Sequence, residues 1–189
     1  MRGRPYRMPD KTDNNVSADG IAAEASKAAK KGGLPPVHLW NPPFCGDLDM
    51  EIRADGTWFY EGTPIGRPAM VRLFSTVLKR EGDKYFLVTP VEKVGIRVQD
   101  APFIATDADI APDRITFTTN VGDEVVADAD HPIVIRGDRY EPRPYVHIRA
   151  GLEALIDRKT FYRLAAAAEE GPDGRAGVRS CGQHFALEV

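Results

Sequence analysis

The sequence has little cysteine, no long apolar run and no surplus of positive charge. Its two cysteines, Cys45 and Cys181, are too few for a disulfide scaffold. The longest uninterrupted apolar stretch, Leu164 to Ala168, is far shorter than the roughly 20 residues that span a bilayer. A net charge of -3 provides no general attraction for nucleic acid or anionic lipid. With polar residues following the opening MRGRPYRMPDK, these absences predict a cytoplasmic protein without a membrane-spanning segment, and they do not favour nucleic acid as a partner.

The common catalytic signatures are also absent from the sequence. It contains no Gly-x-Ser-x-Gly nucleophile motif, no phosphate-binding loop and no Gly-x-Gly-x-x-Gly pattern after a strand. Cys181 and His184 have metal-like spacing, but a zinc site needs three or four ligands. Gly171, Gly174 and Gly177 lie in a Pro-containing tail, where we attribute them to flexibility. The sequence therefore predicts no catalytic residue, no cofactor and no metal site.

Short strand patterns surround one helical pattern in the first half of the chain. Apolar and charged residues alternate over 48–53, Asp55-Gly56 favours a tight turn, and aromatic residues alternate over 58–60. This pattern predicts a β-hairpin with one solvated face. Pro68 favours the start of a helix, and apolar residues at helical spacing predict that it ends near Gly82. Further strands are expected on its carboxyl side, up to residue 98.

The second half repeats this order. Two strand patterns flank Gly122-Asp123, Pro132-Ile133 follows, and a helical region is predicted around Leu152, Leu155 and Ile156. The fold class we predict is α+β, with two small, structurally similar lobes of antiparallel strands and a packed helix in each. Small lobes have small cores, so we expect the two to pack on each other. A true internal duplication and a coincidence of common motifs remain equal alternatives.

The predicted lobes cover residues 34–103 and 104–168. Residues 1–33 are predicted to be a disordered tail and a marginal helix over about 19–31, whose thin apolar face should pack weakly. Residues 169–189 are predicted to be a loop-like C-terminal tail.

Several charged clusters are candidates for chemistry. Asp47, Asp49 and Glu51 lie on one strand face, which alternation alone predicts to be solvated. A basic stretch interleaved with tyrosines could hold an anion, although arginines on a Pro-rich loop are usually solvated. Its candidate anion contacts are Arg136, Arg139, Arg143 and Arg149.

Long, idiosyncratic motifs carry a resemblance to a known family. They are LPPVHLWNPPFCGDLDMEI, DGTWFYEGTPIGRP and YFLVTPVEKVGIRVQDAPF. From about Leu34 to Leu164 the chain resembles the bacterial family known as domain of unknown function 1285. The resemblance implies a two-part α+β protein with repeated halves, a distant likeness to pleckstrin-homology-like modules and a role in signal transduction. It brings no catalytic residues.

The family pattern and the polar residues together suggest a ligand or partner groove. Arg67, at the start of the predicted helix, could meet Glu92 or Asp100, either as a structural ion pair or on the polar rim of an interlobe groove. The groove candidates are Trp40, Trp58, Tyr60, Arg67, Glu92, Lys93 and Asp100.

Three function hypotheses follow from this sequence. The leading one is a non-enzymatic binding or adaptor module that recognises a small ligand or a protein partner, through the interlobe groove or a strand edge. The second is an enzyme of unfamiliar type that uses Asp47, Asp49, Glu92 or Asp100 as acid and base, which requires a buried carboxyl with a raised pKa. The third is a phosphate or nucleic-acid binder through Arg136 to Arg149, with salt-sensitive affinity.

Overall fold

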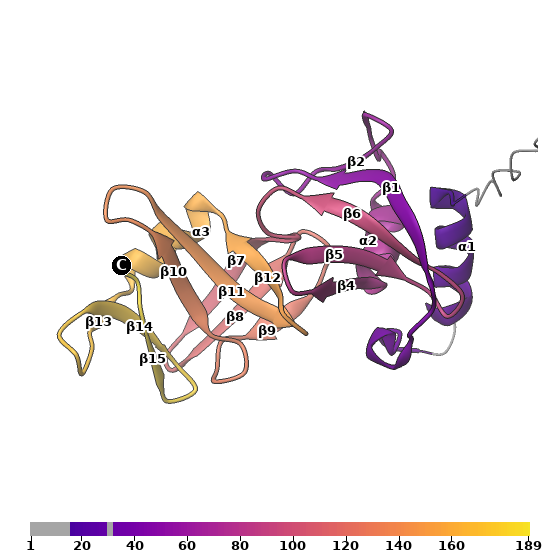
Figure 1. Cartoon of the computed structure of the whole chain (residues 1–189). Helices are drawn as coiled ribbons and strands as arrows, with labels where there is room; N and C mark the ends of the chain where they lie inside the picture. Colours follow the sequence, from indigo (N-terminus) through magenta and orange to yellow (C-terminus); the bar gives the residue numbers. More distant parts are fainter. Residues whose placement is uncertain (1–15, 30–31) are drawn as a thin grey trace, which may run out of the picture.

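The computed structural model describes residues 16–29 and 32–189 of the chain. It is an α+β structure in which two six-stranded sheets lie side by side (Figure 1). We call the part up to residue 102 the first lobe and the part from Phe103 onward the second lobe. Most of the tail predicted for the first 18 residues lies outside the described residues.

The first sheet consists of two three-stranded meanders. The first meander holds β1 (Phe44–Ile52), β2 (Trp58–Tyr60) and β3 (Thr63–Pro64), and the second holds β4 (Leu78–Glu81), β5 (Lys84–Val88) and β6 (Lys93–Val98). The strand order is β3-β2-β1-β6-β5-β4, with β1 and β6 parallel. The predicted hairpin around Asp55-Gly56 is confirmed, with Met50 opposite Tyr60.

The second sheet has the same order. Its strands are β7 (Phe103–Ala111), β8 (Arg114–Thr119), β9 (Glu124–Val126), β10 (Ile133–Gly137), β11 (Pro142–Arg149) and β12 (Leu152–Ile156). The order β10-β11-β12-β7-β8-β9 again places the first and last strands of the lobe side by side and parallel. Two similar lobes are therefore confirmed. The prediction of purely antiparallel sheets is wrong. The connection between the two meanders leaves the first and last strands of each lobe running in the same direction, so these two strands pair in parallel.

The helices occupy different places in the two lobes. In the first lobe α2 (Pro68–Thr76) connects the two meanders and contacts α1 (Ala18–Ala29), whereas in the second lobe α3 (Arg158–Ala166) follows the last strand. The helix predicted to continue to near Gly82 ends at Thr76. There the hydroxyls of Ser75 and Thr76 donate back to main-chain carbonyls, and the next residues pair with β5 as strand β4.

The helical region predicted around Leu152, Leu155 and Ile156 is a strand. Its buried residues alternate with a period of two, which is the strand period, and they face the core as part of β12. Helix α3 begins only after Asp157, whose carboxylate accepts a hydrogen bond from the backbone N–H of Thr160 at 2.8 Å. The capped helix therefore begins only after the apolar residues that the sequence pattern had placed in it.

The C-terminal segment, predicted to be loop-like, is a three-stranded sheet. Its strands are β13 (Glu169–Glu170), β14 (Ala176–Ser180) and β15 (Gln183–Ala186). Cys181-Gly182, both with positive φ, make the two-residue turn between β14 and β15. Val178, Phe185 and Leu187 are buried, and β14 and β15 contact β8 and β10. The segment folds because these apolar residues complete the core of the second lobe.

Two of the tail glycines have a packing role. A methyl group added at Gly171 or Gly177 would collide with the imidazole of His184. The side chain of His184 therefore fits only because both positions lack a Cβ, and flexibility does not explain these glycines.

Helix α1 packs more closely than its thin apolar face predicted. Ile21 and Ala25 are fully buried, and Ala22 is almost so. Small residues allow close approach to α2, which compensates for the narrow face. The last two lysines of the predicted helix lie outside the described residues.

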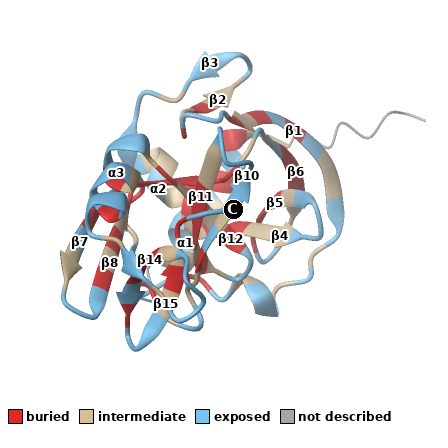
Figure 2. Ribbon diagram, turned by 90° about the vertical axis from the view of Figure 1, so that its left-hand side faces the viewer, coloured by how far each residue is buried: buried red, intermediate tan, exposed pale blue. Residues whose placement is uncertain are grey.

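Buried residues follow the strands of both lobes (Figure 2). They form one connected core that runs from α1 to the C-terminal sheet, and Phe103 is fully buried where the second lobe begins. In the part of the chain that the structure describes, no helix has the length and apolar character needed to cross a membrane.

Candidate functional site

The groove candidates from the sequence are dispersed over the first lobe. Trp58 is 1% exposed and stacks on Phe74 of α2, with ring centroids 6.2 Å apart, so it belongs to the core. Tyr60 is half-buried against the same core. Arg67 precedes α2, is exposed, and forms no ion pair with any described residue. These three residues do not face a common cavity.

Glu92 and Lys93 lie at the start of β6. Burial, and then the nearby carboxylate of Glu24 on α1, raise the pKa of Glu92 above its ordinary value of 4.5. Lys93 pairs with Glu81 at 3.1 Å. The expected pairing of Arg67 with Glu92 is therefore not formed.

Trp40 lies elsewhere again, beside α1. With Glu24, Leu34 and Pro90 it lines a cavity of about 440 Å³.

Asp100 connects the first lobe to the second. Its Oδ2 accepts a hydrogen bond from Nη2 of Arg143 at 2.6 Å, and its Oδ1 accepts one from the Tyr145 hydroxyl at 2.7 Å. Nε of Arg143 also donates to the Tyr145 hydroxyl oxygen at 3.1 Å. Burial, and then the bond to Asp100, raise the pKa of Tyr145, so its hydroxyl remains a donor. Asp100 thus pairs across the lobes and not with Arg67.

A second ion pair lies next to the three hydrogen-bonded residues Asp100, Arg143 and Tyr145. Arg136 forms a bidentate pair with Glu153, with N···O distances of 2.8 and 2.7 Å, and its guanidinium lies 4.6 Å from the ring centroid of Tyr145. The hydrogen bond to Glu153 raises the pKa of Arg136. We call this set the interlobe network: Asp100, Arg136, Arg143, Tyr145 and Glu153.

Two further arginines link the lobes. Arg149 of β11 pairs with Asp123 and donates from Nη2 to the main-chain carbonyl of Ser75 at 2.9 Å, at the end of α2. In the opposite direction, Arg80 of β4 donates from Nη1 to the carbonyl of Gly151 at 3.1 Å. Arg136, Arg143 and Arg149, three of the four predicted anion contacts, are thus paired with carboxylates.

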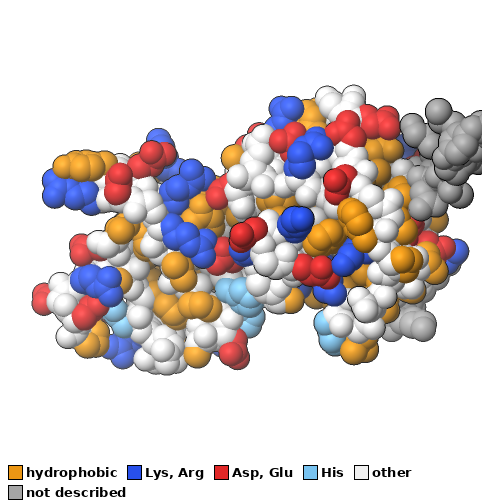
Figure 3. Space-filling view, in the orientation of Figure 1, with side chains coloured by type: hydrophobic (Ala, Val, Ile, Leu, Met, Phe, Trp, Pro, Cys, Tyr) orange, Lys and Arg blue, Asp and Glu red, His pale blue; other side chains and the backbone are white. Residues whose placement is uncertain are grey.

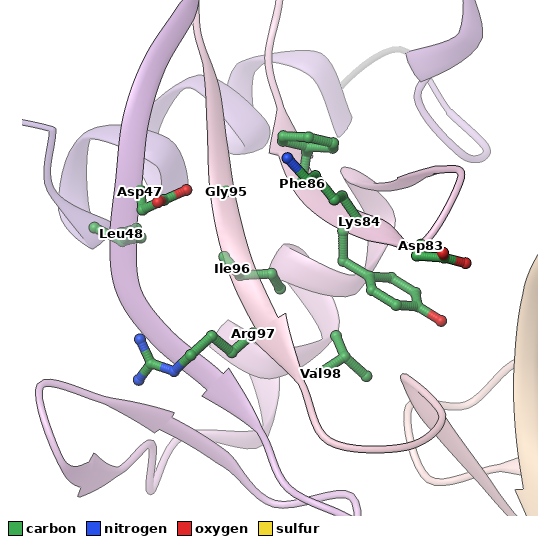
Figure 4. Close-up of a pocket in the computed structure, with 10 residues that line it drawn as sticks. Asp47, Leu48, Asp83, Lys84, Phe86, Gly95, Ile96, Arg97 and Val98 are labelled. Atoms are coloured by element: carbon green, nitrogen blue, oxygen red, sulfur yellow. The ribbon is translucent and has the colours of Figure 1, made fainter.

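The outer face of the first sheet holds the predicted row of carboxylates. Asp47 and Asp49 are exposed, and Arg97 of β6 pairs with Asp49 at 2.8 Å and lies 4.0 Å from Glu51. The predicted solvated face is confirmed. Asp47 extends over Gly95, where a Cβ would collide with its carboxylate (Figure 4). The surrounding depression of about 440 Å³ is open and carries charges of both signs.

A cleft of about 370 Å³ lies between the β10–β11 loop and α3. The loop projects from the second lobe (Figure 1), and basic, acidic and hydrophobic side chains meet on this projection (Figure 3). Two large exposed aromatic residues line the cleft, Tyr140 with 81% of its surface exposed and Tyr162 with 61%. We call it the tyrosine cleft and describe it by six of its lining residues: Tyr140, Arg143, Leu155, Arg158, Phe161 and Tyr162.

The loop holds Tyr140 in place. The carboxylate of Asp138 accepts hydrogen bonds from the backbone N–H groups of Glu141 and Tyr140, at 2.9 and 2.7 Å, and these bonds lower the pKa of Asp138. Arg139, the fourth predicted anion contact, stacks on the Tyr140 ring at 4.5 Å and donates to its hydroxyl at 2.6 Å. Asp138 therefore fixes the backbone at Tyr140, and Arg139 contacts both the ring and its hydroxyl.

Sequence reasoning missed the α3 side of this cleft. Within α3, Thr160 and Leu164 are buried one turn apart, so Tyr162, midway between them, must lie on the outer face. An aromatic residue on the outer face of a helix is the signal that could have identified it.

Comparisons with known proteins identify the family. Two models of one family, described as domain of unknown function DUF1285, match the chain. The model of its N-terminal domain matches residues 35–101, and the model of its C-terminal domain matches residues 102–187. The chain belongs to the DUF1285 family. Both family models describe proteins of unknown function, so membership assigns no activity.

Two solved structures are similar to this DUF1285 chain. A DUF1285 family protein from Silicibacter pomeroyi DSS-3 is 59% identical, with a TM-score of 0.83 over 92% of this chain and 97% of that chain. A DUF1285 family protein from Shewanella baltica OS155 is 29% identical, with a TM-score of 0.51 over 61% of this chain and 89% of that chain. None of the curated proteins matches the sequence.

Proposed function

We propose that this DUF1285 protein is a non-enzymatic binding or adaptor module that recognises a small ligand or a protein partner through the tyrosine cleft. The observation that carries the proposal is the placement of two largely exposed tyrosines, Tyr140 and Tyr162, on one cleft. Burial of exposed aromatic surface contributes strongly to binding. The cleft volume of about 370 Å³ is in the range of small-molecule sites.

The interlobe network supports a scaffold role in this proposal. Its arginines are paired with carboxylates, so a ligand would have to displace those partners to reach them. Asp100 instead fixes Arg143, which lines the cleft, and so extends the rigid scaffold to the site. The setting we propose is a cytoplasmic signalling pathway, with lobes distantly related to pleckstrin-homology-like modules, as the family resemblance implies.

Thermal shift measurements test this function. Wild type is screened against metabolites, nucleotides, metal ions and phospholipid headgroups, together with Tyr162→Ala and a control, Phe44→Ala, which removes an exposed aromatic residue of the first lobe. A ligand at 100 times its Kd stabilises the native state by about 2.7 kcal/mol, which corresponds to a rise in Tm of roughly 5–10 °C for a chain of this size. The shift should persist in Phe44→Ala and disappear in Tyr162→Ala.

A shift that Tyr162→Ala leaves unchanged contradicts recognition at the cleft. If no small molecule shifts Tm, a protein partner is sought by co-purification from the source cell, and the Tyr162→Ala bait should lose that partner. A partner retained equally by both baits would also contradict the proposal.

One observation favours a second candidate function, an acid–base enzyme. Glu92 has the raised pKa that such an enzyme needs, with burial as the main cause. Of the other carboxyls in this alternative, Asp47 and Asp49 are exposed and Asp100 is paired with Arg143. The alternative therefore depends on Glu92. Any hydrolytic or isomerase activity found for the protein should be abolished by Glu92→Gln and unaffected by Asp47→Asn.

A further inference from the structure

The two tyrosines of the cleft offer stacking surfaces on opposite structural elements. Tyr140 lies on the loop after β10, and Tyr162 lies on α3. Leu155 and Phe161, both half-buried, add apolar surface to the same cleft. A flat aromatic ring in this cleft would bury surface on both tyrosines, and stacking of this kind accepts any base.

The charge beside the tyrosines favours an anion. Arg158 lines the cleft at the first residue of α3, and it forms no ion pair with any residue in the ranges 16–29 and 32–189. Arg139, stacked on Tyr140, likewise has no carboxylate partner among the described residues. The carboxylate of Asp157 already caps the start of α3, so the positive charge at this end of the cleft comes from the arginines and not from the helix terminus. Glu141 is the one carboxylate among the described lining residues of the cleft.

Resting on the proposed function, we infer that the tyrosine cleft binds a nucleotide, with its base between Tyr140 and Tyr162 and its phosphate at Arg158. Each part of such a ligand has a matching part in the cleft. The aromatic base meets exposed aromatic rings, and the phosphate meets a guanidinium that no carboxylate neutralises. Asp138 and Arg139 hold Tyr140 in position before a ligand arrives, which lowers the entropy lost on binding.

Titration calorimetry of the full chain with AMP, GMP, CMP and UMP tests the assignment. Tyr162→Ala should weaken binding of AMP about 5- to 150-fold, the range found when one stacking residue is removed. Arg158→Gln should weaken AMP binding and reduce its dependence on salt, because one phosphate contact is lost. The control is Arg114→Gln, which alters an exposed arginine at the start of β8 and should leave the Kd unchanged.

Three further titrants separate the parts of the ligand. Adenosine keeps the base without the phosphate, inorganic phosphate keeps the charge without the ring, and phenyl phosphate keeps a ring that is not a nucleobase. All three should bind at least ten times more weakly than AMP. Phenyl phosphate that binds as tightly as AMP would show that the cleft selects aromatic phosphates in general, and this would overturn the nucleotide assignment.

Failure of this inference can be distinguished from failure of the proposed function. No nucleotide binding at millimolar concentration, or binding that Tyr162→Ala and Arg158→Gln both leave unchanged, overturns the inference. If another ligand then gives a thermal shift that Tyr162→Ala removes, the proposed function stands and only its ligand class is wrong. Circular dichroism of each variant must match wild type, so that a loss of binding is not a loss of fold.

Discussion

The two lobes share one strand order and differ in what covers their sheets. In the first lobe, α1 and α2 pack together beside the sheet, and α2 joins the two meanders. In the second lobe, α3 follows the last strand, and the C-terminal sheet contacts β8 and β10. Because α3 comes after β12, it lies alongside the β10–β11 loop and forms the tyrosine cleft with it. The position of the helix, more than the strand order, determines where a cleft opens.

The lobes also differ in how they use their arginines. On the first sheet, Arg97 pairs with Asp49 in solvent, and about 60% of each side chain is exposed. At the junction, Arg149 and Asp123 are only 20% and 22% exposed. Arg143 and Arg149 of the second lobe thus bond to the first lobe, and Arg80 of the first lobe bonds to the second, whereas Arg97 lies on an open face.

The largest expected effect comes from matched cavities made in the two lobes, at either end of the common core. Phe74 of the first lobe and Phe117 of the second are both fully buried. Replacement of either by Ala should lower the free energy of unfolding by about 3–5 kcal/mol. Both tryptophans of the chain lie in the first lobe, so their fluorescence reports that lobe, whereas far-ultraviolet circular dichroism reports both. Because the core is continuous, Phe117→Ala should shift both signals equally in urea.

A shift in only one of the two signals would show that the lobes unfold independently. If Phe117→Ala moves the circular dichroism transition and leaves the fluorescence transition in place, the second lobe unfolds on its own, and the shared core does not make the chain cooperative.

An intermediate effect is expected from the paired arginines. Arg149→Ala removes an ion pair and the hydrogen bond to the Ser75 carbonyl, and it leaves Asp123 partly buried without its partner. It should destabilise the protein by about 2 kcal/mol, in the range for hydrogen bonds to charged groups. Arg97→Ala, on the open face, should change stability by less than about 1 kcal/mol. Urea denaturation measures both, and equal losses would contradict the distinction between junction and surface.

The smallest effect on stability is expected at Glu92, which faces Glu24 of α1, a helix that has no counterpart in the second lobe. The folded-state pKa of Glu92 is raised, so its contribution to stability is fully present below the unfolded value near 4.5 and is lost as pH rises through the folded value. At pH 7 the charged Glu92 therefore opposes the packing of α1. Glu92→Gln should raise stability there by less than about 1 kcal/mol, since the side chain is only partly buried and solvent screens its charge.

The pH series supplies the control for Glu92→Gln. Below pH 4 the variant and wild type should have the same Tm, because Glu92 is protonated in both states of the wild-type protein. A stabilisation that persists unchanged at pH 4 would show that electrostatics is not its cause.

Local patterns predicted much of the first lobe. The alternation around Asp55-Gly56 predicted the β1–β2 hairpin, and Pro68 predicted the start of α2. The second lobe was harder, because the apolar residues around Leu152 suit a helix or a strand and only burial on the sheet resolves the choice. The boundary placed near residue 103 stays a prediction.

The candidate site was less predictable than the fold. Arg139 and Arg143 were identified because they lie in a basic stretch interleaved with tyrosines. The sequence does not show that Asp100, far away in the chain, pairs with Arg143. Tyr162 was missed because its place on the outer face of α3 becomes clear only once the buried face of the helix, with Thr160 and Leu164, is known. A site assembled from a loop and a helix exists only after both have packed on the same sheet.

The sequence by itself determined the fold class and the two similar lobes, because turn residues and apolar periodicity act over short distances along the chain. Its long motifs carried the resemblance to the DUF1285 family, which the family models confirmed. The tertiary structure alone decided that the C-terminal segment is a sheet, that the arginines pair across the junction, and that Tyr140 and Tyr162 share a cleft. These contacts join residues far apart in sequence. They form only when burial of the common core brings their elements together, and no local pattern encodes that arrangement.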